Sequence, residues 1–306
     1  MLVQRSTLCV LALAGLVLPG EFARAQTVLR WKFRAGQTFQ VHFEQSTTTE
    51  TTGAGKPAGV AIDTQMWMTW RVESVDDQGT AMIKQRFDRL STKMRSGDAT
   101  AIEFDSESAG NPTGPVAELA VAVKPLLGAD FDVTMTSRGA IRDVRVPDSA
   151  AKALQAVDSA ALKKILSAKG LSQVLSESAI EFPEGGLQVG ATWQAKTVTP
   201  SRLGTIKQTR TFTYEGPAER SPKETVQRIS IKGQLDLTPD ENAKTKSKLL
   251  DQKHSGELLF DNAAGRLMQS ESTQTLTTEW RYRDFHIKVQ TATTSKLTLT
   301  AAKPAP

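Results

Sequence analysis

Long stretches in which apolar and polar residues alternate one by one are the feature of this sequence that most constrains its fold. Phe39, Val41 and Phe43 share one face of such a stretch, and the residues between them are polar. Because successive side chains of a β-strand point to opposite faces, a period of two residues predicts strands with one buried face. The same period recurs in Thr-rich stretches along most of the chain, so we expect long antiparallel strands.

Turns that contain glycine join several of these stretches into predicted hairpins. Asp76-Asp77-Gln78-Gly79 separates two alternating stretches, and Ser137-Arg138-Gly139 separates two more. Further strands are predicted at residues 203–214, 225–237, 255–261, 265–279 and 284–299, with polar loops at 217–223 and 239–248.

The middle of the chain changes to helical spacing. Between Ser149 and Ser178 the apolar residues fall three and four positions apart, which predicts one helix, or two helices broken at Gly170. A shorter helix is predicted over residues 116–123. We therefore predict an α+β fold with long, twisted antiparallel strands that form either a half-barrel or two β lobes. In this prediction, helices from residues 115–180 cover one open face of the sheet.

The N-terminal residues have the pattern of a signal peptide. Arg5 precedes an apolar run from Leu8 to Leu18, and Ala23-Arg24-Ala25 has the small-x-small form of a cleavage site. The run is shorter than the roughly 20 residues that a membrane-spanning helix needs, so retention as an anchor is the weaker alternative. We expect cleavage after Ala25 and export to the bacterial periplasm or the extracellular space, with no membrane span afterwards.

Five segments follow from these patterns: a signal peptide (1–25), a first β-rich half (26–147), a helical segment (148–182), a second β-rich half (183–300) and a disordered tail (301–306). The two β-rich halves begin alike. Phe33-x-x-Gly36-x-x-Phe39 matches Leu187-x-x-Gly190-x-x-Trp193, which raises the hypothesis of an internal duplication.

Three short motifs resemble a known group of proteins. They are the opening run from Leu29 to Phe39, the Gly139-Ala140-Ile141 hairpin with the helix start at Asp148-Ser149, and the run from Gly256 to Asp261. In these motifs the chain resembles exported bacterial β-rich proteins that are classed as a domain of unknown function. The resemblance implies export and a β-rich architecture, and it implies no activity or catalytic residue.

Charge and metal-ligand content exclude several classes of function. The 38 Lys and Arg residues are interspersed with 33 Asp and Glu residues, so the net charge of +5 marks no nucleic-acid surface. The three histidines, His42, His254 and His286, have no helical His or carboxylate partner, and the only cysteine, Cys9, lies in the signal peptide. We predict no metal site, no cofactor and no disulfide in the mature chain.

Three short patterns in the sequence are candidates for a catalytic site. Ser149 and Lys152 have the Ser-x-x-Lys spacing, but the remaining motifs of penicillin-interacting enzymes are absent, and Ser149 suits a helix N-cap. The segment Gly53–Pro57 lacks the first Gly of a phosphate loop and the Ser or Thr that would hold Mg²⁺. Alternating carboxylates at residues 103, 105 and 107 are typical of a solvated strand face. We assign no catalytic residue and predict that the protein is not an enzyme.

Methionine and tryptophan gather in one predicted strand. Met66, Met68 and Trp70 share a face, where they either pack an ordinary core or line a pocket for a variable apolar ligand. Our leading hypothesis is an exported non-enzymatic protein that binds a lipid or another apolar small molecule in a cleft between sheet and helices. The alternative is a structural or interaction module of the cell envelope that binds a protein or acidic polymer through the basic loop 244–248.

Overall fold

The computed structural model describes residues 26–53, 58–108, 117, 120, 121, 123–155, 167, 169, 170, 179–201, 204–221, 224–239, 245–282 and 285–302. Its strands are β1 (Thr38–Thr52), β2 (Ala58–Val75), β3 (Ala81–Ser96), β4 (Ile102–Asp105), β5 (Asp130–Met135), β6 (Ile141–Arg145), β7 (Thr192–Ser201), β8 (Gly204–Ser221), β9 (Glu224–Pro239), β10 (Lys246–Asp261), β11 (Arg266–Tyr282) and β12 (Phe285–Ala301). The helical elements are η1 (Lys124–Leu126) and α2 (Asp148–Gln155).

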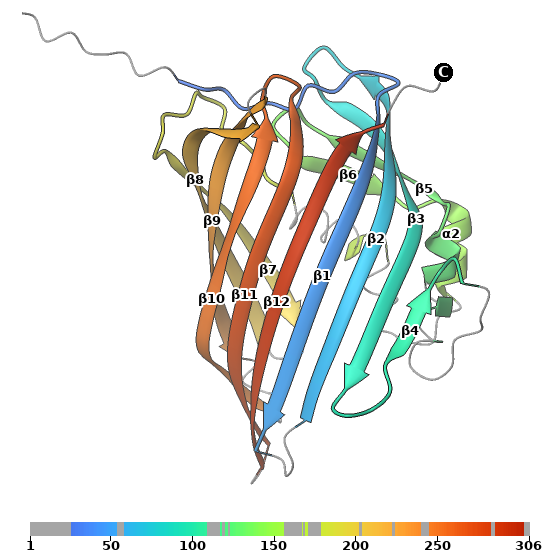
Figure 1. The fold of residues 1–306 in the computed structure, drawn as a ribbon, viewed down its shortest axis with the longest axis vertical. Coiled ribbons are helices and arrows are strands. Elements are labelled where there is room, and N and C mark those ends of the chain that lie inside the picture. Colours follow the sequence, from blue (N-terminus) through green and yellow to red (C-terminus); the bar gives the residue numbers. More distant parts are fainter. Residues whose placement is uncertain are drawn as a thin grey trace, which may run out of the picture.

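All of these strands belong to one antiparallel sheet, which Figure 1 shows face-on. Its order is β6-β5-β3-β2-β1-β12-β11-β10-β9-β8-β7, and β4 pairs with β3 beside this path. Most neighbours are consecutive hairpins, including the predicted hairpins at Asp76–Gly79 and Ser137–Gly139. There are two exceptions: β3 pairs with β5 as well as with the intervening β4, and the ladder between β1 and β12 places the first and last strands side by side in the middle of the sheet.

The α+β class expected from the sequence is wrong. Strands account for 70% of the structure and helices for 6%, and there is a single sheet rather than two lobes. Within the predicted helical region, the longest described helix is Asp148–Gln155; residues 117, 120, 121 and 123 of the predicted helix 116–123 are also helical, as are 169 and 170, and most of residues 156–178 lie outside the described part. A helix of two turns cannot form a layer against strands that are up to 18 residues long. In the described part of the chain, no helix is both long and apolar enough to cross a membrane.

Several strands run on through segments that we predicted to be polar loops. β8 continues through Pro217 to Ser221, and β10 begins at Lys246. In each case the residues pair with a neighbouring strand, β9 and β11 respectively. Polar residues are compatible with a strand when at least one of its faces meets solvent, so their composition did not mark the strand ends.

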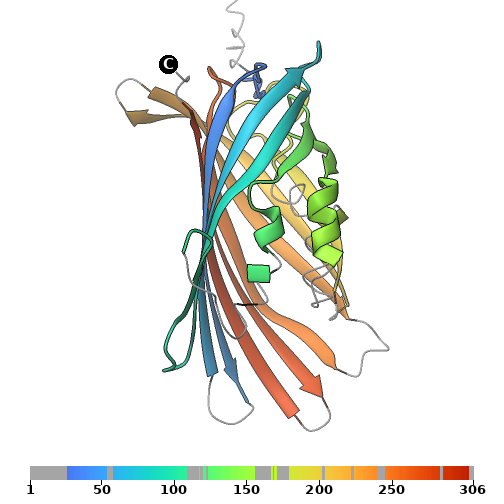
Figure 2. The ribbon, with the colours of Figure 1, turned by 90° about the vertical axis from the view of Figure 1, so that its right-hand side faces the viewer.

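The sheet is strongly curved. Figure 2 shows that both of its ends bend to the same side of the central strands and that α2 lies on that side. We call this side the concave face and the other the convex face. The register places Phe39, Val41 and Phe43 on the concave face, next to Leu297 and Leu299 of β12. Alternating residues such as His42 therefore lie on the convex face.

The main hydrophobic core fills the upper part of the concave face, as oriented in Figure 1. Large side chains of β1, β8, β9 and β10 meet there with side chains from outside the strands. The fully buried members include Phe39, Phe212, Tyr214, Ile229 and Phe260. Each such side chain contributes about 1.5–3 kcal/mol through its removal from water, so this core is a major source of stability.

The segment before β1, residues 26–35, closes the top of this core, and we call it the lead-in segment. Its Leu29, Trp31 and Phe33 are buried in the core, and Trp31 stacks on Phe33 with ring centroids 5.2 Å apart. The backbone N–H of Trp31 donates to Ser137 O at 2.8 Å, and that of Lys32 donates to Gly265 O at 2.9 Å. The lead-in segment therefore contacts the turns of two hairpins, β5–β6 and β10–β11.

The turns that precede β1 and β7 have the same backbone geometry. Gly36 and Gly190 both have positive φ, of 80° and 87°. The N–H of Gly36 donates to Val72 O of β2, and the N–H of Gly190 donates to Tyr214 O of β8, both at 2.8 Å. This correspondence supports the internal duplication, which stays a prediction.

We expect Gly139→Ala to destabilise the protein strongly. Gly139 has φ +96°, and a Cβ there would lie 2.2 Å from Ile180 O and 3.0 Å from Trp31 Nε1. The substitution combines a left-handed backbone penalty of roughly 1–2 kcal/mol with displacement of the Ile180 backbone and of the Trp31 side chain. Equilibrium urea unfolding measures the loss.

The matched control is Gly36→Ala, because Gly36 has φ +80° but no heavy atom within 4 Å of an added Cβ. This variant should show the backbone penalty alone. Equal losses in the two variants would contradict the close packing of Gly139 against Ile180 and Trp31.

Candidate functional site

The three predicted ligand residues all lie on the concave face of β2, but at different depths. Met68 is 8% exposed and belongs to the main core, while Met66 and Trp70 are partly buried and pack against it. Trp70 Nε1 is buried and has no hydrogen-bond partner in the described structure. Met66 is the lowest of the three as Figure 1 is oriented, so it stands at the border between the packed core and the lower concave face.

The register defines a row of side chains at that border, which we call the upper row. The upper row crosses seven strands, from β2 to β8 in the order of the sheet, and each residue is the register partner of the next. Its members are Met66, Phe43, Leu297, Ser270, Leu258, Ile229 and Tyr214. Below the upper row, the concave face carries aliphatic side chains that are only half-buried. Val60, Ile62, Leu276 and Val289 are examples, and they belong to neither hydrophobic cluster of the described residues.

Threonine pairs cover much of the remaining lower concave face. Thr47 and Thr293 approach to 3.2 Å between their Oγ1 atoms, and Thr49 and Thr291 approach to 3.4 Å. Because each hydroxyl finds its partner on the adjacent strand, the pairs satisfy their own polar groups. The lower concave face is therefore less polar than its composition suggests.

A second row, four residues further along each strand, is polar. We call it the polar belt, and on strands β8 to β12 it contains Arg210, Gly233, His254, Gln274 and Thr293. At about 3.4 Å per residue, it lies roughly 14 Å below the upper row. Below the upper row, Arg210 and His254 are the only Arg, Lys, His, Asp or Glu residues that the register places on the concave face of the described strands.

His254 is packed closely against β9. A Cβ at Gly233 would lie 1.9 Å from His254 Nδ1, so the imidazole occupies the space left by the missing side chain of Gly233. His254 Nδ1 is buried and has no hydrogen-bond partner in the described structure. Burial lowers the pKa of His254, and the positive charge of Arg210 lowers it further. The imidazole is therefore neutral at neutral pH.

A cleft opens where β9 and β10 separate. Their ladder covers only Gln227–Gly233 and His254–Phe260. Beyond it, the side-chain amide of Gln252 replaces a strand partner: Nε2 donates to Leu235 O at 2.7 Å, and Leu235 N donates to Oε1 at 2.6 Å. The cleft has a volume of about 550 Å³, and it is lined by four leucines together with charged side chains: Leu235, Leu237, Leu249, Leu250, Asp236, Lys248 and Asp251. It gives the lower concave face a lateral opening.

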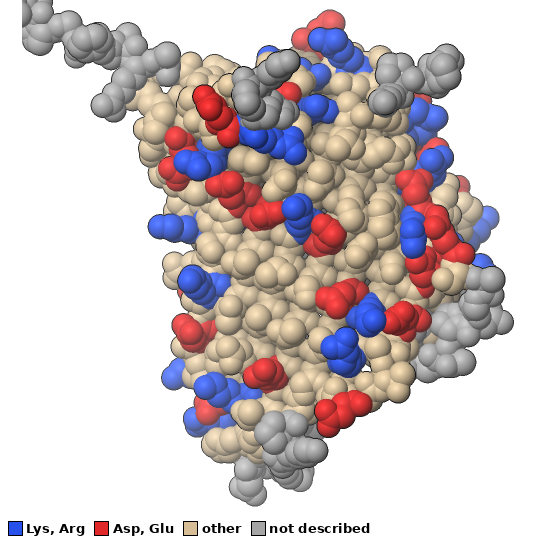
Figure 3. Space-filling model, viewed as in Figure 1, with Lys and Arg blue, Asp and Glu red and all other residues tan. Residues whose placement is uncertain are grey.

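On the convex face, neighbouring side chains cover both sides of the Trp67 indole ring. Trp67 of β2 stacks on His42 of β1 with ring centroids 4.8 Å apart, and the guanidinium carbon of Arg89 of β3 lies 4.6 Å from the Trp67 ring centroid. Since β1 and β3 flank β2 on opposite sides, both sides of the indole are occupied. Figure 3 shows the charged residues of this face in small groups of mixed sign.

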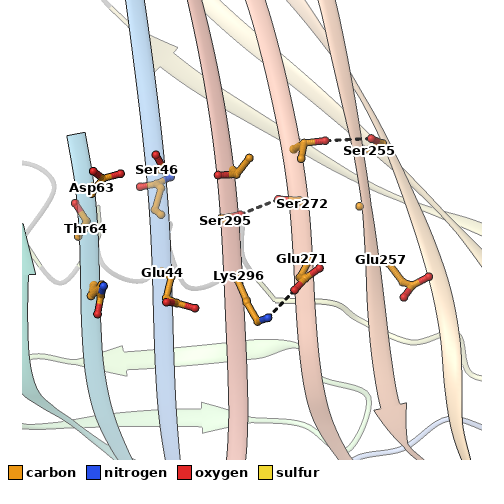
Figure 4. Close-up of a pocket in the computed structure, with 15 residues that line it drawn as sticks. Glu44, Ser46, Asp63, Thr64, Ser255, Glu257, Glu271, Ser272, Ser295 and Lys296 are labelled. Carbon is orange, nitrogen blue, oxygen red and sulfur yellow. Dashed lines mark hydrogen bonds and ion pairs between the residues drawn. The ribbon is translucent and has the colours of Figure 1, made fainter. Parts of the chain in front are cut away.

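A shallow hollow of about 710 Å³ crosses the convex face from β2 to β10. Figure 4 shows its labelled carboxylates Glu44, Glu257 and Glu271 in one band with Lys296. Lys296 Nζ lies 2.8 Å from Glu271 Oε1, and this hydrogen bond, together with the charge of Glu44, raises the pKa of Lys296. A lining of hydroxyl and carboxylate groups does not suit an apolar ligand.

The residues weighed as catalytic are not assembled into a site. Ser149 and Lys152 are both exposed. Glu103 pairs with Lys93 at 2.5 Å, and Asp105 pairs with Arg89 at 2.5 Å, which lowers the pKa of Asp105. These carboxylates therefore serve in ion pairs on the sheet. No group of three or more His, Cys, Asp or Glu residues in the described ranges is placed to hold a metal ion.

Two other segments from the sequence analysis are described only in part. Residues 54–57 of the glycine loop and Lys244 of the basic loop lie outside the described residues. Lys246 and Lys248 are exposed at the start of β10, with the buried Ser247 between them.

The polar belt was missed in the sequence analysis. His254 has the same alternation as Leu258 and Phe260, which could have placed it on the concave face. The sequence holds no comparable signal for its neighbour Arg210, because the two residues meet only through the register of three strands.

We expect His254 to make stability depend on pH. Its lowered pKa means that the unfolded chain binds a proton, near pH 6.5, that the folded protein does not bind. The contribution of His254 to the free energy of unfolding is therefore fully present above about pH 6.5 and is lost as the pH falls through the folded-state pKa. Urea unfolding at several pH values between 7.5 and 5 should show that the free energy of unfolding of the wild type falls as the pH falls. The slope of this free energy against pH should be shallower in His254→Gln.

The control is His286→Gln, since His286 is exposed on β12. It should keep the wild-type slope. An unchanged slope in His254→Gln would contradict the buried, neutral state of His254.

Several solved structures are distantly similar to this chain. A structure described as "Lipid-protein interactions in lipovitellin" matches 90% of this chain at 12% identity and a TM-score of 0.48, and the chain spans only 26% of the lipovitellin chain. DynF from the dynemicin biosynthesis pathway of Micromonospora chersina matches 92% of this chain and 88% of its own at 9% identity and a TM-score of 0.21. OccK7 (OpdD) of Pseudomonas aeruginosa matches 89% of this chain and 100% of its own at 7% identity and a TM-score of 0.22.

No curated protein matches the sequence. A family model does match it, over residues 78–275, and is described as a family of unknown function (DUF6263). The match confirms the resemblance to a domain of unknown function that was inferred from the sequence. It extends from the turn before β3 into β11 and covers more than half of the chain. The protein therefore belongs to this family of unknown function, DUF6263.

Proposed function

We propose that this protein is an exported, non-enzymatic binding protein that holds an apolar or amphipathic ligand on the lower concave face of its sheet. The observation that carries the proposal is the set of half-buried aliphatic side chains on that face, which includes Val60, Ile62, Leu276 and Val289. They face inward yet stand outside both hydrophobic clusters of the described residues.

The physical argument rests on unburied apolar surface in a concave setting. Covering such surface gains roughly 25 cal/mol per Å², so a ligand of acyl-chain size would gain several kcal/mol from these side chains. The paired threonine hydroxyls oppose this gain little, because they already bond to each other. The cleft between β9 and β10, which both leucine and charged side chains line, provides a path from solvent.

The three residues first predicted to contact a ligand have different roles in this proposal. Met66 lies at the lower border of the core, where the end of an apolar ligand would touch it. Met68 lies in the core and Trp70 packs against it, and both would support Met66 from above. Met66 suits the contact because its unbranched thioether adapts to ligands of different shape.

Export is supported only by the sequence pattern of residues 1–25, which lie outside the described residues. Cell fractionation of the full-length protein would test it. Recovery of the uncleaved chain from the cytoplasm would contradict this part of the proposal.

We expect the purified protein to carry an apolar molecule. Native mass spectrometry should show a mass above that of the polypeptide, and solvent extraction should release the bound molecule for identification. A protein that travels alone and takes up no fluorescent fatty-acid or naphthalene probe would contradict the proposed function.

We also expect Val289→Glu to abolish probe uptake. Val289 is half-buried on the concave face of β12, and a carboxylate there would oppose an apolar ligand. The matched control is Gln290→Glu, which adds a negative charge at the next residue on the exposed, convex side. Fluorescence titration of both variants, with circular dichroism to confirm folding, separates a loss of binding from a loss of structure. Equal binding by the two variants would place the ligand elsewhere.

A further inference from the structure

We propose that the cleft between β9 and β10 accepts an extended segment of a partner protein, which adds to the open edge of β9 as a further strand. The incoming segment carries alternating apolar and basic side chains. This strand site is distinct from the apolar ligand site of the proposed function, because it uses backbone groups at a strand edge. The residues that carry it all line the cleft: Leu235, Asp236, Leu237, Asp251 and Gln252.

The cleft exists because β10 turns away from β9 next to a bulge. The β10–β11 ladder shifts register between Leu249 and Asp251, so Leu250 is an extra residue in β10. A bulge bends the strand that carries it and increases its twist. The β9–β10 ladder ends nearby, at the pair of Gly233 and His254. Beyond that pair, the facing edges of the described parts of β9 and β10 are not joined in a ladder.

The side-chain amide of Gln252 occupies the place of a strand backbone in this gap. The N–H of Leu235 donates to Gln252 Oε1 at 2.6 Å, and Gln252 Nε2 donates to Leu235 O at 2.7 Å. A residue of a neighbouring antiparallel strand would supply the same pair of one donor and one acceptor. The amide therefore marks the line along which a peptide backbone fits against β9.

Leu237 presents the same backbone groups to the cleft without a partner strand. Backbone groups of residues two apart point to the same side of a strand, so the N–H and C=O of Leu237 point as those of Leu235 do. The described part of β10 contributes no register partner to Leu237. Pro239 has no N–H and ends the row of donors. Such an open edge is the feature to which extended peptides add as strands.

The volume of the cleft suits a short strand. With a rise of about 3.4 Å, a strand spacing of about 4.8 Å and a sheet thickness of about 10 Å, one strand residue fills roughly 160 Å³. The cleft of about 550 Å³ therefore has room for roughly three to four residues. This length matches the edge from Leu235 to Pro239.

The two sides of the cleft differ in polarity. Leu235 and Leu237 are half-buried on the concave side of β9, and Leu249 is half-buried on the concave side of β10. Asp236 and Asp251 are exposed on the convex side of the same strands. Because side chains of a strand alternate between faces, an incoming strand would place every second residue on the leucines and the others beside the carboxylates.

The carboxylates of the cleft are available to basic side chains. Neither Asp236 nor Asp251 forms an ion pair in the described structure, and the register partner of Asp236, Lys207, does not contact its carboxylate there. Lys248 supplies the only positive charge among the described lining residues, so the lining has a net negative charge. A basic partner strand complements it.

The first test uses the wild-type protein and a six-residue peptide of alternating leucine and lysine with blocked termini. Two further forms of the peptide are N-methylated, one at its leucine amides and one at its lysine amides, so that each lacks the donors of one edge. Isothermal titration calorimetry should show binding of the unmodified peptide and roughly 10-fold weaker binding of at least one methylated form, as expected for lost hydrogen bonds. A peptide with glutamate in place of lysine should also bind more weakly.

A pair of variants separates the backbone of Leu237 from its side chain. Leu237→Pro removes the N–H that faces the cleft and should weaken binding of the peptide about 10-fold. Leu237→Ala keeps the N–H and should lose less. Gln252→Ala frees the backbone of Leu235 and should tighten binding, whereas a merely structural role of Gln252 would not produce tighter binding. Circular dichroism confirms that each variant is folded.

Hydrogen exchange gives a direct readout of the strand edge. In the wild type, the unmodified peptide should slow exchange of the Leu237 amide, and the weaker-binding methylated form should not at the same concentration. For the charges, Asp236→Asn should weaken binding of the lysine peptide. Its control is Glu50→Gln, which removes an exposed charge from the convex side of β1 and should leave binding unchanged.

Three results would overturn the strand site without affecting the proposed apolar ligand. They are equal binding of the unmodified peptide and both methylated forms, an unchanged exchange rate at Leu237, and the absence of any binding. A dimer in sedimentation velocity that Leu237→Pro dissociates would also overturn it, because the occupant would then be a second copy of this chain.

Discussion

The ladder between β1 and β12 is the constraint on which the rest of the structure depends. It runs from Phe39 paired with Ala301 to Thr52 paired with Lys288 and joins the sequence-distant ends of the sheet. Without it, the strands would form two separate sheets, β6 to β1 and β12 to β7. The upper row, the polar belt and the continuous concave face all cross this ladder. Closing so long a loop is not prohibitive, since each doubling of loop length costs only about 0.6 kcal/mol, but such non-local pairing slows folding.

Local features of the fold were accessible from the sequence, and distant ones were not. The alternation of Phe39, Val41 and Phe43 and the turn at Asp76–Gly79 identified strands and hairpins, because both signals involve neighbouring residues. The pairing of β1 with β12 left no such signal, because Thr-rich strands specify register weakly. The predicted α+β class was wrong because the helical spacing after Ser149 was taken to indicate a layer of helices over the sheet, whereas α2 ends at Gln155.

Much the same division applies to the candidate site. Alternation correctly put Met66, Met68 and Trp70 on one face, but it could not show that Met68 would lie inside the core and Met66 at its lower border. His254 was judged by the absence of a metal-ligand motif, although its significance lies in its face and its neighbours. The approach of Arg210 and His254 across Gly233 depends on the register of β8, β9 and β10, which no local pattern contains.

The lead-in segment has a mechanical consequence for the sheet as a whole. It is bonded at Ser137 to one hairpin, at Gly265 to another, and at Leu187 to the segment that precedes β7. These bonds tie together parts of the sheet that lie far apart along its strand order, and they do so at the upper end only. In the described part of the chain, the opposite end of β9 and β10 is instead splayed. The lead-in segment thus cross-links the sheet at its upper end, while at the lower end the described parts of β9 and β10 pair only with their outer neighbours β8 and β11.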